Sequence, residues 1–176
     1  ELWSTGVHAY RGVTCADCHM PYRSEGGVKF TDHRVQSPLE NIANSCGVCH
    51  RWSEDEVRSR VESIQTKVYH TRNAAEEVII KAHFDVRAAL DAGVPAADLA
   101  AARTLLRHAQ FRWDFVASSN GMGFHSPQEA TRILGDAVRE AGEARLAATR
   151  LLAARGISAT PSYPAIPNRA KAVEVA

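Results

Sequence analysis

The chain has 176 residues, of which 45% are hydrophobic and 23% are charged, an ordinary composition for one globular domain or a piece of a larger one. The formal net charge of +1 produces no strong field for nucleic acid, so no nucleic-acid partner is expected. No apolar run approaches the roughly 18 residues of a membrane span. The chain begins Glu1-Leu2-Trp3, without an initiator Met or a signal peptide, and we expect it to be the C-terminal part of a longer precursor.

Residues 1–52 are predicted to form an irregular head. This segment contains several Gly and Pro residues and little hydrophobic periodicity, and no strand is predicted in it. It also contains all four cysteines of the chain, in two CxxCH motifs, a pattern at which c-type haem is attached. We therefore expect this segment to bind haem or metal.

Residues 53–156 are predicted to be a region of long helices. The first helix begins with a capping box at Ser53 and Glu56 and ends at Gly93-Val94-Pro95. Its apolar residues alternate in steps of three and four and form one stripe: Val57, Val61, Ile64, Val68, Ala75, Val78, Ala82, Val86 and Ala89. This near-heptad spacing predicts packing against another long helix.

Two further helices and a tail follow. The second helix is expected from about Ala96 to Ala117, and the third begins at a capping box with Pro127 at its first position and ends near Ala154. The tail, residues 157–176, contains three prolines and no stripe and is predicted to be mobile or draped over a surface. The predicted fold class is mainly α, with an irregular multihaem head followed by long helices.

The cysteines form two CxxCH motifs, Cys15-Ala-Asp-Cys18-His19 and Cys46-Gly-Val-Cys49-His50. A zinc site or two disulfides would leave both histidines unexplained, and a thioredoxin-type redox motif would need a βαβ context that is absent. Covalent haem c explains every position, because two cysteines one turn apart can form thioethers to one porphyrin and the next residue can ligate its iron. We therefore favour two haem c groups with proximal ligands His19 and His50, and keep zinc as the alternative.

The remaining histidines are candidates for the sixth iron ligand. His8, His33 and His125 lie in irregular segments beside turns or helix starts, where an imidazole can be directed at a metal. Three others lie within predicted helices and are expected to be solvated: His70, His83 and His108.

Three stretches, "YRGVTCADCHMPY", "KFTDHRVQSPLENIANSCGVCH" and "FRWDFVASSNGMGFHSPQEATRIL", resemble the C-terminal half of the ammonia-forming cytochrome c nitrite reductases, a pentahaem periplasmic family. The resemblance covers about residues 1–150. It implies that Cys15, Cys18 and His19 hold the family's fourth haem, with His125 as its distal ligand.

The same resemblance implies that Cys46, Cys49 and His50 hold the fifth haem, with His8 as its distal ligand. His33 is similar to the distal ligand of the second haem, whose own motif is not in this chain. One histidine ligand is therefore left over for a haem attached outside residues 1–176.

The resemblance also implies a function. The family reduces nitrite to ammonium with six electrons at a haem whose iron is ligated by the Lys of a CxxCK motif. This chain contains no CxxCK, and the family's catalytic residues and calcium ligands would lie upstream. We expect bis-His electron-transfer haems here, a homodimer formed through the long helices, and a quinol dehydrogenase subunit or a multihaem cytochrome as electron donor. The alternative is a non-catalytic multihaem electron-transfer cytochrome or a related octahaem oxidoreductase.

The location follows from the haem chemistry. Thioether attachment of haem c takes place outside the cytoplasm, so we expect a periplasmic or other extracytoplasmic protein.

Overall fold

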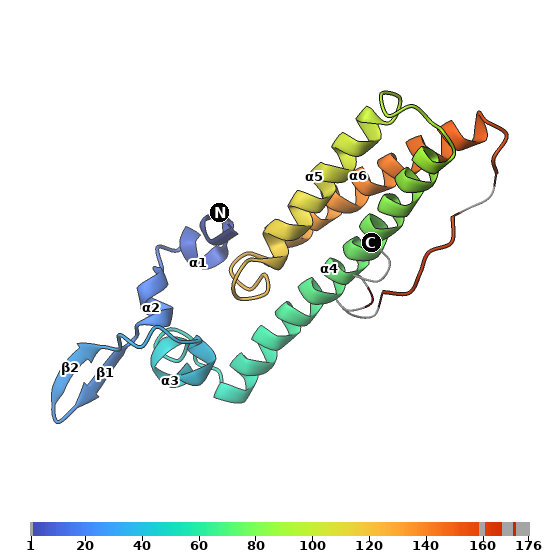
Figure 1. Ribbon diagram of the computed structural model, residues 1–176. Helices are drawn as coiled ribbons and strands as arrows, with labels where there is room; N and C mark the ends of the chain where they lie inside the picture. The colour runs from blue at the N-terminus through green and yellow to red at the C-terminus, as the bar shows by residue number, and fades with distance from the viewer. Residues whose placement is uncertain (1, 159–160, 167–170, 172–176) are drawn as a thin grey trace. The chain divides into compact units, whose positions relative to one another are not determined.

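The computed structural model describes residues 2–158, 161–166 and 171 (Figure 1). The chain divides into two compact units: residues 1–71 with 118–132, and residues 72–117 with 133–176. The first unit contains the predicted head, and the second contains most of the three long helices.

The first unit is built from short elements. In chain order they are η1 (Leu2–Thr5), α1 (Val7–Tyr10), α2 (Cys15–His19), β1 (Tyr22–Glu25), β2 (Val28–Thr31), η2 (Pro38–Glu40) and α3 (Ile42–Ser45). The same unit includes the first turns of α4 and the loop that precedes α6.

The prediction that the head contains no strand is wrong. β1 and β2 form an antiparallel hairpin in which Tyr22 is paired with Thr31. Gly26 and Gly27 connect the strands with φ values of 56° and 82°, as required by a two-residue hairpin turn. The strands are short and mostly exposed, so their sequence lacks an alternating apolar pattern, and only the Gly-Gly pair signals the hairpin.

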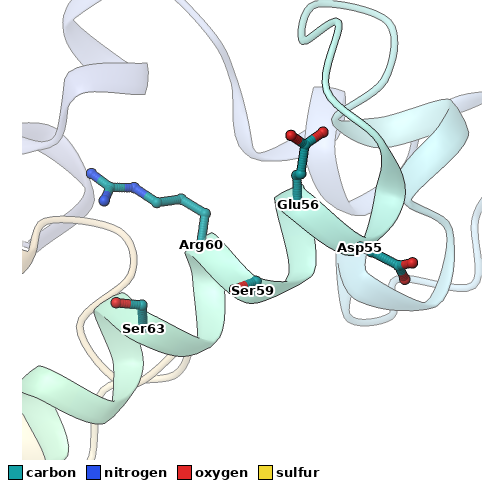
Figure 2. A pocket seen from close by; sticks show the side chains of 5 residues that line it. All are labelled: Asp55, Glu56, Ser59, Arg60 and Ser63. Carbon is teal, nitrogen blue, oxygen red and sulfur yellow. The ribbon is translucent and has the colours of Figure 1, made fainter.

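Helix α4 (Glu54–Asp91) confirms the first predicted helix. Ser53 caps it, because its hydroxyl oxygen accepts from the Glu56 backbone N–H at 3.3 Å. In return, the Ser53 backbone N–H and hydroxyl both donate to the Glu56 carboxylate at 2.8 Å. Figure 2 shows the side chains that line a shallow hollow along the first turns of this helix: Asp55, Glu56, Ser59, Arg60 and Ser63. All of them project from α4, so the hollow is a feature of one helix surface.

The other two long helices are α5 (Ala100–Ala117) and α6 (Pro127–Ala153). Helix α5 begins at Ala100, later than expected, because the chain first makes turns in which the Asp98 N–H donates to the Pro95 carbonyl and the Ala100 N–H to the Ala97 carbonyl. Among the helices in the described part of the chain, none is long and apolar enough to cross a membrane.

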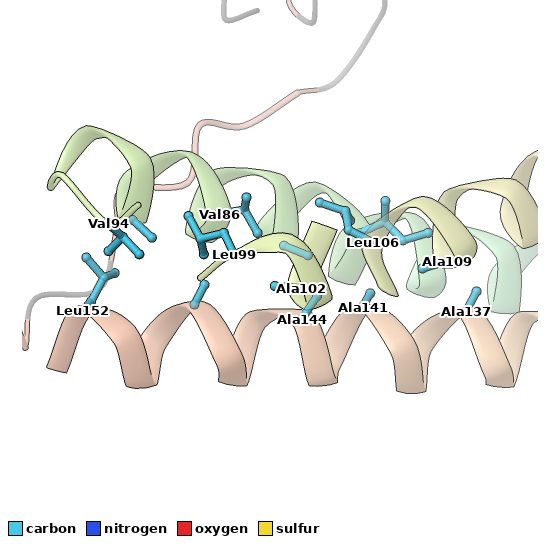
Figure 3. Close-up of a cluster of buried hydrophobic side chains, with 14 residues drawn as sticks. Val86, Val94, Leu99, Ala102, Leu106, Ala109, Ala137, Ala141, Ala144 and Leu152 are labelled. Carbon is cyan, nitrogen blue, oxygen red and sulfur yellow. The ribbon is translucent and has the colours of Figure 1, made fainter. Parts of the chain in front are cut away.

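The hydrophobic core lies in the second unit, where α4, α5 and α6 pack together. Figure 3 shows small alanines of α6, including Ala137, Ala141 and Ala144, directed at larger side chains such as Leu99 and Leu106. Because an alanine side chain ends at Cβ, neighbouring helices can approach closely along this face. The predicted packing of the first helix against other long helices is therefore observed.

A buried polar cluster adds to the second unit. Asp85 is 2% exposed, and its carboxylate accepts hydrogen bonds from Arg145 Nε at 2.7 Å and from the Tyr163 hydroxyl at 2.6 Å. Tyr163 belongs to the predicted tail, so part of that segment is bonded to the helices. Residues 159–160, 167–170 and 172–176 lie outside the described residues, and the expectation of mobility there stays a prediction.

Candidate functional site

The first CxxCH motif forms helix α2. Thr14 caps this helix, and the Asp17 carboxylate accepts from the Thr14 N–H at 2.6 Å and from its hydroxyl at 2.8 Å. These bonds lower the pKa of Asp17, the backbone bond contributing most. At the end of the helix, His19 Nδ1 lies 2.9 Å from the Gln36 carbonyl oxygen, which leaves Nε2 available for a ligand.

The second CxxCH motif continues from helix α3. The Cys46 carbonyl accepts hydrogen bonds from the N–H of Cys49 at 3.1 Å and of His50 at 2.8 Å, so the motif closes on itself as one turn. A Cβ on Gly47 would lie 2.7 Å from the Ala43 carbonyl oxygen, which explains why the residue after Cys46 has no side chain.

The two motifs belong to the same unit and lie near each other. None of the four cysteines is paired in a disulfide. Burial is the main cause that raises the pKa of Cys18, and the neighbouring Cys46 thiol raises it further. The structure therefore places the thiol of one motif within electrostatic reach of the other.

Each motif histidine faces one distant histidine. The ring centres of His19 and His125 lie 6.3 Å apart, with 69° between the ring planes. The ring centres of His8 and His50 are also 6.3 Å apart, with 88° between the planes. His8 comes from α1, and His125 from the loop before α6.

The separation in these pairs can accommodate one metal ion. Two metal–nitrogen bonds of about 2.0 Å and two spacings of about 1.1 Å between ring nitrogen and ring centre span about 6.2 Å. Among the described residues, no group of three or more His, Cys, Asp or Glu side chains is arranged to hold a metal ion. A pair of imidazoles is sufficient for a haem iron, because the porphyrin supplies the other ligands.

The environments of His8 and His125 favour the neutral form of each imidazole. Burial lowers the pKa of His8 below its usual value, and the nearby His50 lowers it further. Burial also lowers the pKa of His125, followed by the effects of His19 and His8. Neutral imidazole is the form that binds a metal, so these shifts favour ligation.

The loop that carries His125 is fixed by contacts within the first unit. The Thr5 hydroxyl donates to the Ser126 hydroxyl at 3.0 Å, and Gln65 Nε2 donates to the Gly121 carbonyl at 3.1 Å. Gly123 has φ +76°, and a Cβ at this position would lie 2.8 Å from the buried side chain of Val68. The position of His125 is thus determined by residues far from it in the sequence.

His33 stands apart from both histidine pairs. It is exposed, follows the hairpin, and its Nδ1 lies 2.9 Å from the Thr31 carbonyl. Its neighbour Asp32 is 6% exposed and pairs with Arg34 Nη2 at 2.8 Å and Arg23 Nη1 at 3.1 Å. The pairing of Asp32 with these arginines was not predicted from the sequence.

The histidines assigned to helix surfaces are where they were expected. His70, His83 and His108 are all exposed. The sequence analysis did miss the aromatic neighbours of the candidate ligands. The Trp3 ring lies edge-on to the His125 ring, with 5.7 Å between the ring centres. The ring centres of Phe124 and His8 are 6.1 Å apart. Trp52 is stacked on His50, with 5.0 Å between the ring centres.

The head leaves much apolar surface uncovered. Within the described residues up to 52, only Leu2 and Ile42 are buried hydrophobic residues of the core. The exposed large side chains include Val7, Tyr10, Tyr22, Val28, Phe30, Val35, Val48 and Trp52. A porphyrin would cover apolar surface of this kind, so the residues present fit a haem better than a small ion.

A family model described as cytochrome c552 matches residues 1–176, the whole chain. The chain belongs to the cytochrome c552 family. Cytochrome c-552 of Bacteroides fragilis ATCC 25285 is 47% identical over 174 residues, which cover 99% of this chain and 35% of that protein. Cytochrome c-552 of Porphyromonas gingivalis W83 is 42% identical over 172 residues, which cover 98% of this chain and 34% of that protein.

A solved structure also resembles this cytochrome c552 chain. Cytochrome c nitrite reductase from Desulfovibrio desulfuricans ATCC 27774, described for the two calcium sites of its catalytic subunit, matches with a TM-score of 0.78 and 34% identity. The match covers 85% of this chain and 32% of that one. The resemblance to the nitrite reductase family and the mainly helical fold are therefore confirmed, and the chain spans about a third of the length of these relatives.

Membership in the cytochrome c552 family has consequences for cofactor and location. The family uses c-type haems and calcium, and four cysteines in two CxxC pairs are consistent with two haems. c-type cytochromes are typically extracytoplasmic proteins.

Proposed function

We propose that this chain carries two covalently attached bis-His haems that deliver electrons within an ammonia-forming nitrite reductase. The observation that carries the proposal is the pairing of each CxxCH histidine with one distant histidine at 6.3 Å. The haem supplies one-electron redox chemistry when bound. The chain's own residues attach it, ligate it and determine how much water reaches it.

The proposed ligand sets follow the geometry. Cys15 and Cys18 would attach one haem, and His19 and His125 would ligate its iron. Cys46 and Cys49 would attach the other, with His50 and His8 as ligands. With both axial positions taken by histidine, neither site has a free position for nitrite, so these residues support electron transfer only.

His33 is proposed as an axial ligand of a third haem that is attached outside residues 1–176. Its exposure and its hydrogen-bonded Nδ1 support this role, because Nε2 remains accessible from outside. The reduction of nitrite to ammonium, the Lys-ligated haem and the family's calcium site would then belong to the part of the enzyme beyond this chain.

The partners and the location are proposals as well. Exposed apolar side chains on the long helices support a homodimer formed through them: Leu90, Phe111, Phe115, Val138 and Leu146. The electron donor would be a quinol dehydrogenase subunit or a multihaem cytochrome, and the compartment the periplasm. Light scattering on the haem-loaded chain tests the homodimer directly.

The ligand assignment is tested by replacing the distant histidines one at a time. His125→Ala should convert the Cys15/Cys18 haem from low-spin to high-spin or five-coordinate, and His8→Ala should do the same to the Cys46/Cys49 haem. His70→Ala is the matched control, because His70 is an exposed helix residue. A fully low-spin spectrum in His125→Ala would contradict the assignment.

A non-catalytic multihaem electron carrier is the second candidate. The observation that favours it is the absence of a CxxCK motif from residues 1–176. A CxxCK motif upstream in the gene that encodes this chain would support the reductase, whereas CxxCH motifs alone would support the carrier.

A further inference from the structure

Trp52 has an unusual position beside the second motif. Its indole ring is stacked on the His50 imidazole, with 5.0 Å between the ring centres and 13° between the planes. The side chain nevertheless remains 57% exposed. Among the described aromatic contacts, the one that orients this indole is therefore its stacking on His50.

The backbone on both sides of Trp52 is anchored. On one side, the His50 N–H donates to the Cys46 carbonyl at 2.8 Å. On the other, the Ser53 N–H and hydroxyl are held by the Glu56 carboxylate at the start of α4. Only Arg51 separates Trp52 from His50, so the chain has little freedom to move the indole away from the imidazole.

A purely structural role would place Trp52 differently. A hydrophobic residue before a helix cap commonly packs on the fourth helical residue, which here is Val57. Val57 is 6% exposed, but Trp52 is not correspondingly buried. The face of the indole lies on the His50 imidazole, so packing of Trp52 on Val57 does not explain the orientation of the ring.

We propose that Trp52 is a positioning residue that fixes the ring plane of His50 and shields this imidazole from water. The inference rests on the proposed ligation of a haem iron by His50 and His8. The imidazole planes of these two residues are 88° apart. Rotation of His50 about its bond to the metal would break the stacking, so the indole holds the planes nearly perpendicular.

This role predicts two observable effects. The angle between two axial imidazole planes sets the splitting of the iron d orbitals, and so the anisotropy of the ferric low-spin EPR signal. Exposure to water stabilises the charged ferric form over the ferrous form, so loss of the indole should lower the reduction potential. Both effects should be confined to the Cys46/Cys49 haem.

The experiment uses the haem-loaded chain and three substitutions. Trp52→Leu removes the stacking ring, and Trp52→Phe keeps an aromatic ring on His50. Tyr69→Leu is the control, because Tyr69 also contacts an imidazole, that of His70, with 5.7 Å between the ring centres, and His70 is not a proposed ligand. EPR and redox titration are recorded for each, and also in the His125→Ala background, where the other low-spin signal should be lost.

The expected result is a changed EPR anisotropy and a lowered potential for one haem in Trp52→Leu, with values near the wild type in Trp52→Phe and in the control. Unchanged signals and potentials in Trp52→Leu, with both haems attached, would overturn the inference while leaving the proposed function intact. Loss of the haem from both Trp52 variants would also overturn it, because the role would then be structural. A wild-type chain without covalent haem would overturn both proposals.

Discussion

Gly6 lies against the backbone carbonyl of His125, so close that a Cβ at position 6 would overlap the carbonyl oxygen. The backbone of Gly6 has φ −83° and ψ 156°, which any residue can adopt. Glycine is therefore required here by the close approach of two segments and not by backbone conformation. The contact joins the segment that carries His8 to the loop that carries His125.

Gly6→Ala should separate these two segments. Because the clash is with backbone, a side-chain rotation cannot relieve it, and we expect a destabilisation of about 1–3 kcal/mol. In the haem-loaded chain the low-spin fraction of both haems should fall, as measured by visible and EPR spectra.

Gly135→Ala provides the control for this substitution. Gly135 lies in α6 with no atom near the position of a new Cβ, so alanine should stabilise the helix by up to about 1 kcal/mol. Equal behaviour of the two variants would show that the approach of Gly6 to His125 is unimportant.

Tyr163→Phe should destabilise the second unit. The substitution leaves the buried carboxylate of Asp85 with one fewer donor, and a hydrogen bond to a charged group contributes about 1.5–3 kcal/mol. Chemical denaturation of the wild type and the variant measures this difference. No change in the free energy of unfolding would show that the tail contributes nothing through this bond.

The contribution of Tyr163 to the free energy of unfolding should also depend on pH. Burial, followed by the hydrogen bond to Asp85, raises the pKa of Tyr163 above its ordinary value of 10.0. The stabilisation is therefore complete below pH 10.0 and is lost as the pH rises through the higher, folded-state pKa. The difference between the wild type and Tyr163→Phe should shrink in that alkaline range, where a constant difference would contradict the assignment.

Asp32→Asn should loosen the hairpin next to His33. The carboxylate is buried, but Arg23 and Arg34 are substantially exposed, with side-chain exposures of 41% and 60%. Solvent screening reduces the stabilisation that such ion pairs provide, so we expect Asp32→Asn to lower the free energy of unfolding by about 1–2 kcal/mol. Faster amide hydrogen exchange in β1 and β2 would report it, while Lys29→Gln in the same hairpin should leave exchange unchanged.

Glu56→Gln should remove a pH dependence at the start of α4. The hydrogen bonds from the Ser53 backbone and then from its hydroxyl lower the pKa of Glu56 below its usual 4.5. The cap is therefore fully effective above pH 4.5 and weakens as the pH falls through the lower, folded-state value. Amide exchange at Ser53 should follow this transition in the wild type and not in Glu56→Gln, whose amide can still cap the helix. The same titration curve in both would exclude Glu56 as its source.

The long helices could be predicted because their signals are local and repeated. The stripe through Val61, Val68, Ala75 and Ala82 is buried as expected, and the capping residue Ser53 marks the first boundary correctly. The stripe also contains Ile79, which the pattern missed. The hydrogen bonds that Arg145 and Tyr163 donate to Asp85 could not be predicted. They join segments that are distant in the sequence, and no local pattern shows how such segments are aligned.

In the head, local sequence predicts less of the candidate site than it predicts of the long helices. The spacing of the CxxCH motifs alone predicts the attachment residues and the proximal ligands. The pairing of His8 with His50 and of His125 with His19 could not be predicted from residue spacing, because it depends on distant contacts such as that between Gly6 and the His125 backbone. Only the family resemblance indicated these pairs. The stacking of Trp52 on His50 was also missed, although a tryptophan two residues after a ligand and directly before a helix cap is a recognisable signal.

The central claim is that the two CxxCH motifs bind haem covalently. The most direct test is the intact mass of this chain, produced with cytochrome c maturation machinery, together with a pyridine haemochrome spectrum. We expect a mass increase equal to two haems and a spectrum typical of two thioether-linked haems per chain. A chain that carries no haem and binds zinc through its cysteines would contradict it.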